Sequence, residues 1–179
     1  MNNPVKITVN ADGSFNIGNY RFDKFSEENG RVVAVCRDNL FNSRFGDNND
    51  FRQSDILKKL TEDVLPKIES IIGAENVLEF ETDLLSLDGS AKYGTMKSKI
   101  SIPTFDFYRK NRKFFEEHKA DYWWWLATPD STDEYNTADW CTCVSPSGNF
   151  YDFNCVYFSD IGVRPFFNFV STIFVSCED

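Results

Sequence analysis

The sequence contains one histidine, His118, and its five cysteines include no Cys-x-x-Cys pair. A structural zinc site needs thiolates and imidazoles at tetrahedral spacing, so this pattern does not fit one. Nucleophilic catalysis needs a base beside the nucleophile, and a lone histidine at the polar end of an expected helix is a poor candidate. We therefore expect no catalytic residue, no metal, no cofactor, and free thiols at Cys36, Cys141, Cys143, Cys155 and Cys177.

Long apolar runs are also missing. No stretch approaches the ~18 apolar residues of a membrane-spanning helix, and Met1 to Asn10 has no apolar signal-peptide core. The net charge of -9 lacks the basic footprint of a nucleic-acid-binding protein. We expect no membrane insertion, no nucleic-acid partner, and synthesis in the cytoplasm, with association with a virion left open.

Aromatic residues are abundant instead. They make up 16% of the chain, and 18 of them are phenylalanine. A chain of 179 residues is long enough for one domain with a sizeable core, so we expect a single domain over residues 1–179. Flat rings suit a core in which small sheets and irregular loops pack together.

The N-terminal part is typical of scaffold. Alternation in Val5–Val9 and Phe15–Ile17, around a turn, predicts a hairpin. The apolar run Arg31–Arg37 predicts a buried strand. The loop Asn39–Phe51 is rich in Asn and Asp but lacks the positioned glutamate of a calcium loop, so we expect it to be solvated.

Ser54 is a helix cap ahead of apolar residues at helical spacing up to Ile72. Pro66 lies inside this pattern and removes a backbone donor, which predicts a kink or two short helices meeting near Asp63. Gly73 is expected to end the segment.

Three short strands and a second helix are expected next. Val77–Phe80, Thr82–Leu87 and the edge strand Lys97–Ile102 are the strand candidates. Thr104 can cap a helix over Phe105–Lys119. Its basic residues Arg109 to Lys113 are interpreted as a solvated face, with a partner site as the alternative.

The C-terminal third carries a resemblance. Trp124-Trp125-Leu126, then Thr128-Pro129, Ser147-Gly148 and Gly162-Val163-Arg164-Pro165 resemble a bacterial and phage domain family of unknown function with WWLRSPG and GVRPA motifs. The resemblance implies a C-type lectin-like α+β fold close to the formylglycine-generating enzymes, with small mixed or antiparallel sheets, two main helices and a long irregular C-terminal region. Ala127 stands where the family usually has arginine, and Arg164 is expected to anchor an ion pair.

Residues Cys141 to Cys177 contain no Lys, Glu, Gln, Met or Trp. None of these five residue types has a codon ending in a pyrimidine. Random change at the first two bases of asparagine codons never produces them, whereas it does produce Phe, Tyr, Asp, Asn, Cys and Ser. Diversity-generating retroelements rewrite template adenines in this way, and their targets resemble the fold just described. An ordinary aromatic, strand-rich core is the alternative explanation.

We therefore predict a non-enzymatic binding module of phage or mobile-element origin, which presents a variable aromatic surface to a protein or glycan. Its fixed residues are expected at Val144, Gly148, Val156 and Gly162 to Pro165. The predicted ligand-binding residues are Tyr135, Cys141, Cys143, Phe150, Tyr151, Asp152, Phe153, Asn154, Tyr157, Phe158 and Asp160.

Two other functions stay open from the sequence. An acidic phage protein could inhibit a host defence protein by occupying its basic nucleic-acid groove. An oxidase could use Cys141, Cys143 or Cys155, although likeness of fold does not carry activity.

Overall fold

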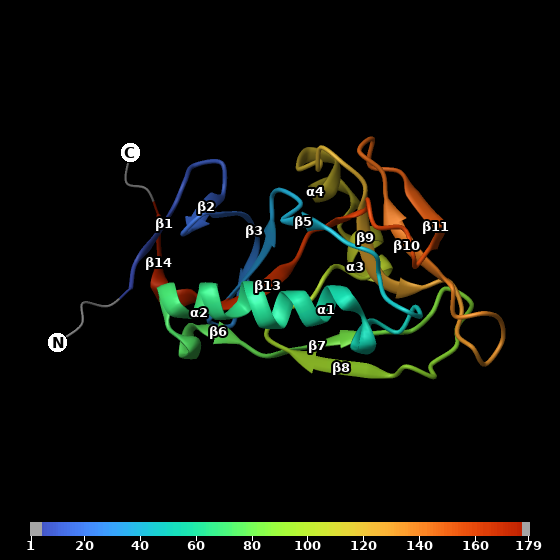
Figure 1. Cartoon of the computed structure of the whole chain (residues 1–179). Coiled ribbons are helices and arrows are strands. Elements are labelled where there is room, and N and C mark those ends of the chain that lie inside the picture. Colours follow the sequence, from blue (N-terminus) through green and yellow to red (C-terminus); the bar gives the residue numbers. More distant parts are fainter. Residues whose placement is uncertain (1–4, 177–179) are drawn as a thin grey trace.

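The computed structural model describes residues 5–176, and these residues form a mixed α+β fold (Figure 1). Two five-stranded and two two-stranded sheets accompany one main helix and two short helices. The expected α+β class is confirmed at this level. The expectation of two main helices is wrong, because the second is divided.

The first five-stranded sheet is antiparallel throughout. In spatial order its strands are β2 (Ser14–Ile17), β3 (Tyr20–Glu28), β4 (Arg31–Cys36), β13 (Phe166–Val170) and β6 (Val77–Leu78). The predicted buried strand at Arg31–Arg37 is confirmed as β4. Phenylalanine rings from three strands, Phe15, Phe22, Phe167 and Phe169, pack on one another at its inner face. The aromatic content thus supplies this part of the core.

The second five-stranded sheet carries the C-terminal motifs. Its order is β11 (Phe150–Cys155), β10 (Trp140–Val144), β9 (Trp124–Pro129), β12 (Gly162–Val163) and β5 (Phe41–Asn42). Only β9 and β12 are parallel. A tight turn at Gly148, with φ +81°, joins β10 to β11, as the sequence Pro146-Ser147-Gly148 predicts. Strand β11 forms one edge of the sheet.

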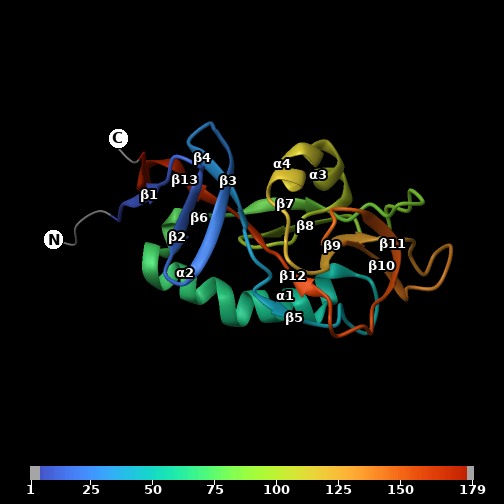
Figure 2. The same cartoon turned by 90° about the horizontal axis from the view of Figure 1, so that it is seen from above.

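The predicted hairpin between Val5–Val9 and Phe15–Ile17 is wrong. Strand β1 (Ile7–Val9) instead pairs in parallel with β14 (Phe174–Ser176), after a 3-10 turn at Ser171–Ile173. Strand β2 pairs with β3. The two ends of the described chain therefore lie side by side (Figures 1 and 2).

The remaining two-stranded sheet joins β7 (Phe80–Asp83) to β8 (Thr95–Ser98). The expected strands in this region are therefore present but shorter or shifted. The segment after β8 continues as an isolated bridge from Ser101 to Phe166.

The main helix runs without a break through α1 (Asp55–Lys59), a π-helical turn (Leu60–Val64) and α2 (Leu65–Ile72). A 3-10 turn, Phe51–Gln53, precedes it, and another, Ala74–Asn76, follows. The Ser54 hydroxyl accepts from Leu57 N–H, and Gly73 ends the helix with φ +88°, so both predicted ends are confirmed. The disturbance expected near Asp63 takes the form of the π turn, because the helix loses the Pro66 N–H donor just after it.

The second predicted helix, Phe105–Lys119, is divided into α3 (Phe105–Lys110) and α4 (Arg112–Glu117). Thr104 caps α3 as expected, by accepting from Phe107 N–H. The break falls at Asn111, whose side-chain amide donates to Phe107 O at 2.8 Å. An asparagine side chain that bonds to nearby backbone competes with helix continuation.

The main helix and the α3/α4 pair cover different sides of the sheets (Figure 2). Strand β9 serves both sides, because Trp125 and Ala127 join the core of the main helix while Trp124 and Leu126 join that of α3 and α4. All of β9 is consequently buried.

Arg164 is fully buried, and the ion pair expected for it is not formed within residues 5–176. Its Nε donates to Cys36 O at 2.6 Å, and its guanidinium carbon lies 5.4 Å and 5.5 Å from the ring centres of Trp124 and Phe115. Burial lowers the pKa of Arg164 to about 10. The residue therefore acts through stacking between two rings, which joins the two ends of the C-terminal motif.

Arg164→Met should change the free energy of unfolding by less than about 1 kcal/mol, whereas Arg164→Ala should lower it by about 3 kcal/mol. Methionine keeps the contacts with both rings and removes the cost of burying a charge, whereas alanine leaves a cavity. Urea unfolding of both variants measures the difference. Equal losses would mean that the charge itself stabilises the fold.

Candidate binding surface

Strand β11 presents the predicted binding residues in two directions. Phe150 packs on Phe105 of α3, with ring centres 4.3 Å apart, whereas Tyr151 packs on Trp123 at 4.7 Å. The register of β11 against β10 shifts between Tyr151 and Asn154, so the side chains do not alternate strictly there. Asp152 lies near Asp130, on which its charge acts, whereas Asn154 lies beside Cys143. The predicted residues of this strand therefore belong to two surfaces.

On the face of Tyr151 lies a pocket of about 200 Å³, here called the aromatic pocket. Its lining consists of Tyr122, Trp123, Asn154, Phe158, Asp160 and Ile161. These residues come from the segment before β9, from β11, and from the loop between β11 and β12.

Backbone pairing brings these segments together. The Gly162 N–H donates to Trp123 O at 2.8 Å, which fixes the end of the β11–β12 loop beside the start of β9. A Cβ at Gly162 would lie 2.2 Å from Asn39 Nδ2 and 2.8 Å from Trp123 O. Only glycine allows this approach, and its place in the motif follows from that contact.

The aromatic pocket leaves large apolar groups in water. Tyr122 is 45% and Phe158 50% exposed, and Tyr151 and Tyr157 nearby in the sequence are also exposed. Exposed aromatic groups that gather at a hollow mark a site of interaction. Sequence reasoning missed Tyr122, Trp123 and Ile161, although the first two directly precede the Trp124-Trp125 motif.

Asn154 and Asp160 supply the polar groups of the aromatic pocket. The Asn154 side-chain amide donates to Cys143 Sγ. Its carbonyl oxygen can accept a hydrogen bond, and its second N–H remains as a donor. Asp160 is exposed. Both polar groups of the lining can therefore accept hydrogen bonds from a ligand.

The prediction that Cys141 and Cys143 belong to an exposed surface is wrong, because both are fully buried. They lie on β10, which β9 and β11 flank on either side. Burial raises the pKa of Cys143 to about 12 and that of Cys141 well above its ordinary value of 9.0. The Cys141 thiol donates to Thr128 O at 3.3 Å.

The other predicted residues are distributed as follows. Tyr135, Tyr151, Asp152, Tyr157, Phe158 and Asp160 are exposed, and Phe150 and Asn154 are half-buried. The Phe153 side chain lies outside the described structure. Tyr135 lines a separate shallow hollow beside Lys92 and Glu134, so it does not join the aromatic pocket.

The loop Asn39–Phe51, expected to be solvated, is partly core. Asn49 is fully buried; its amide donates to Ser131 O and Trp140 O at 2.8 Å each, and its oxygen accepts from Tyr93 Oη at 2.7 Å. Asp50 is buried as well and pairs with Arg52. This loop therefore holds the segment that carries Tyr135.

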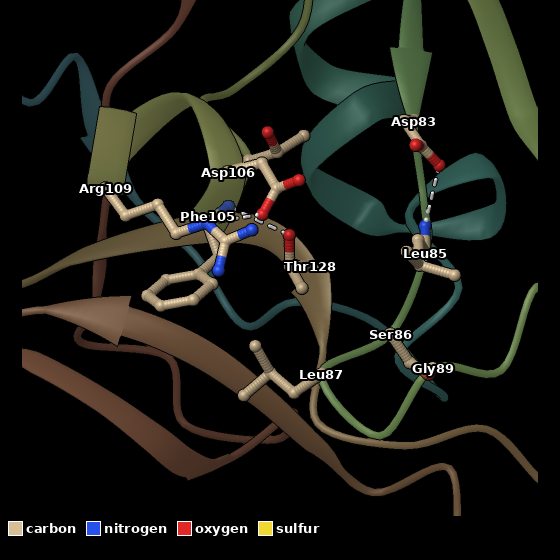
Figure 3. Close-up of a pocket in the computed structure, with 10 residues that line it drawn as sticks. Asp83, Leu85, Ser86, Leu87, Gly89, Phe105, Asp106, Arg109 and Thr128 are labelled. Atoms are coloured by element: carbon tan, nitrogen blue, oxygen red, sulfur yellow. Dashed lines mark hydrogen bonds and ion pairs between the residues drawn. The ribbon is translucent and has the colours of Figure 1, made fainter. Parts of the chain in front are cut away.

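Figure 3 shows a second pocket, of about 180 Å³, whose lining includes Phe105. The ring of Phe105 packs on Phe150 of β11. The second pocket is formed by the loop after β7, the start of α3 and Thr128. Asp106 pairs with Arg109 at 2.9 Å, Asp83 accepts from Leu85 N–H, and Thr128 Oγ1 accepts from Phe105 N–H. Its polar groups are thus paired with one another, which leaves less for a ligand than the aromatic pocket offers.

Near this second pocket, burial raises the pKa of Asp130 above 3.8, and the neighbouring charges of Asp152 and Asp88 add to the shift. Such a shift records negative potential around a partly buried carboxyl group. With Ser131 and Ser86 as its hydrogen-bond donors, Asp88 has a lowered pKa and stays ionised.

The side chain of His118, the single histidine, is 21% exposed. It stacks on Phe114 at 4.4 Å, and its Nδ1 lies 2.9 Å from Phe114 O. Over residues 5–176, no group of three His, Cys, Asp or Glu side chains is arranged to hold a metal ion. In the same part of the chain, no helix is long and apolar enough to cross a membrane.

Comparisons with protein-family profiles, with curated proteins and with solved structures gave no match. The resemblance to the WWLRSPG and GVRPA family therefore rests on the motifs of the sequence.

Proposed function

We propose that this chain is a non-enzymatic binding module that uses the aromatic pocket and the exposed side of the β11–β12 loop to grip a protein or glycan receptor. The observation that carries the proposal is the aromatic pocket itself, with Tyr122 and Phe158 half-exposed around it. Aromatic side chains give large contact areas at low entropic cost, which suits recognition. Burying such rings against a partner supplies most of the free energy of a small interface.

The proposal includes a C-type lectin-like fold and origin in a phage or mobile element. Its support is the motif resemblance together with the contact between the two motif ends, where Arg164 stacks on Trp124. It also includes diversification of the C-terminal part by a retroelement. The expected fixed residues Val144, Gly148, Val156 and Gly162 to Pro165 are all buried, whereas most expected variable residues are exposed or half-buried. This division suits a scaffold that tolerates change at its surface.

Thiol chemistry is the less favoured function. A thiolate is the reactive form of cysteine, and burial raises the pKa values of Cys141 and Cys143. Nothing specific favours the acidic inhibitor either, because many carboxylates pair with a neighbouring Lys or Arg. Examples are Asp50 with Arg52, Asp55 with Arg44, and Glu69 with Lys99.

The genetic part of the proposal predicts a near-copy of the 3′ end of the gene that differs only at adenines, beside a reverse transcriptase gene. Sequencing the surrounding DNA tests this. Mismatched codons should fall at exposed residues such as Tyr151, Asp152 and Phe158. Adenine mismatches confined to the codons of buried residues would contradict the proposed surface.

The binding part predicts that Phe158→Ser weakens attachment of the labelled protein to receptor-bearing bacteria by about tenfold or more. Ile71→Ser is the matched control, because Ile71 is an exposed apolar residue on α2, 46% accessible, outside the aromatic pocket. Prior treatment of the cells with protease or with periodate separates protein from glycan receptors. Equal binding by Phe158→Ser and the wild type would refute this surface.

In a Cys177→Ser background, iodoacetamide at pH 8 should label Cys36, Cys141 and Cys143 at least about tenfold more slowly than half-buried Cys155, because burial keeps them protonated and covered. Peptide mass spectrometry measures the rates. Since the pKa of Cys143 is raised, its neutral form stabilises the fold below pH 9.0, and that contribution is lost as the pH rises towards about 12. Rapid labelling of Cys141 or Cys143 would restore thiol chemistry as a candidate.

A further inference from the structure

The lining of the aromatic pocket contains three aromatic rings and one carboxylate, and it contains no lysine or arginine. From Cys141 to Ser176 the only basic residue is Arg164, which is fully buried. The exposed charges of this segment are therefore those of Asp152 and Asp160. Within residues 5–176, Asp160 takes part in none of the ion pairs.

The hydrogen-bonding groups of the lining, like its charge, favour a cationic ligand. Asp160 presents a carboxylate, which only accepts, and Asn154 adds its carbonyl oxygen as a second acceptor while one of its two N–H groups is used on Cys143. Guanidinium and ammonium groups carry only donors and match such a lining. The faces of Trp, Tyr and Phe rings also attract cations.

Size decides between a side chain and a larger ligand. The aromatic pocket holds about 200 Å³. Sites for whole small molecules usually hold ~300–1,000 Å³. One side chain from a partner protein fits better than an oligosaccharide.

Elsewhere in the chain, an arginine contacts both an aromatic ring and a carboxylate. Arg52 lies over the ring of Tyr93, with its guanidinium carbon 5.5 Å from the ring centre, and it pairs with Asp50 at 2.6 Å. A planar guanidinium can stack on a ring and meet a carboxylate at once, which a compact ammonium group does less well. The aromatic pocket provides a ring and a carboxylate without the cation.

We propose that the aromatic pocket receives an arginine side chain of a protein receptor, with the guanidinium group between the rings and paired with Asp160. This rests on the proposed function, since it takes the aromatic pocket as the receptor site and selects a protein over a glycan. The acidic chain would also attract a basic receptor surface at a distance.

The test is a titration of the isotope-labelled full chain with N-acetylarginine methylamide, followed by NMR, with N-acetylcitrulline methylamide as the uncharged probe of the same shape. The arginine probe should shift the Trp123 indole signal and the amide signals of Phe158 and Asp160. The citrulline probe should bind at least about fivefold more weakly. Asp160→Asn should weaken arginine binding by about fivefold, whereas Asp152→Asn, outside the lining of the aromatic pocket, should change it less than about twofold.

Equal binding of arginine and citrulline, or no shift with either, would overturn the inference. If methyl glycosides shift Trp123 and Phe158 instead, the pocket takes a glycan, so the proposed function stands and the arginine inference fails. If attachment to receptor-bearing bacteria survives Phe158→Ser, the proposed function fails, whatever the probes show.

Discussion

The structure depends on one close contact, the approach of Gly162 to the start of β9. The Gly162 N–H donates to Trp123 O, and no side chain fits between them and Asn39. This contact sets β12 parallel to β9 and directs Arg164, two residues later, into the space between Trp124 and Phe115. The same contact places the preceding loop, with Phe158 and Asp160, beside Tyr122 and Trp123. One backbone contact therefore positions residues of both the core and the aromatic pocket.

Burial of β9 and β10 decides which residues can meet a ligand. Helices cover both sides of β9, and β10 lies between β9 and β11, so the tryptophans of β9 and the cysteines of β10 are core, whereas Trp140 at the start of β10 is exposed. Exposed rings remain at the edge strand β11 and in the loops that flank it. An edge strand and its loops can change sequence with little effect on packing, since few of their side chains are buried. This is the physical reason why the proposed variable surface and a fixed scaffold can share one short segment.

The charge around the aromatic pocket follows from the positions of the Lys and Arg side chains. The chain is acidic, with a net charge of -9, and the only cation of the C-terminal segment is enclosed by rings. Elsewhere, about half of the Lys and Arg residues form ion pairs, as Lys92 does with Asp133 and Arg37 with Asp23. The aromatic pocket is thus left with negative charge and without a lysine or arginine in its lining. This charge is the basis of the proposed preference for a cationic ligand, which ring content alone would not provide.

Local physical chemistry made parts of the fold predictable from the sequence. The Ser54 and Thr104 caps, the end of the main helix at Gly73, the turn at Gly148 and the buried strand β4 each depend on neighbours within a few residues, so the chain itself determines them. Among the predicted site residues, Asn154, Phe158 and Asp160 line the aromatic pocket; the composition near the motif, and not local bonding, predicted them.

Contacts between distant segments decided the rest. The partner of β1 is β14, nearly the whole chain away, and no local pattern distinguishes it from β2. Cys141 and Cys143 look like their exposed neighbours in sequence, but strands on both sides bury them. By itself the sequence determined the caps and the turns, because these arise from bonds between near neighbours, and its motif resemblance implied the α+β class. Only the tertiary structure decided which aromatic residues form the core and which surround a pocket, because that depends on how β9, β11 and β12 pair.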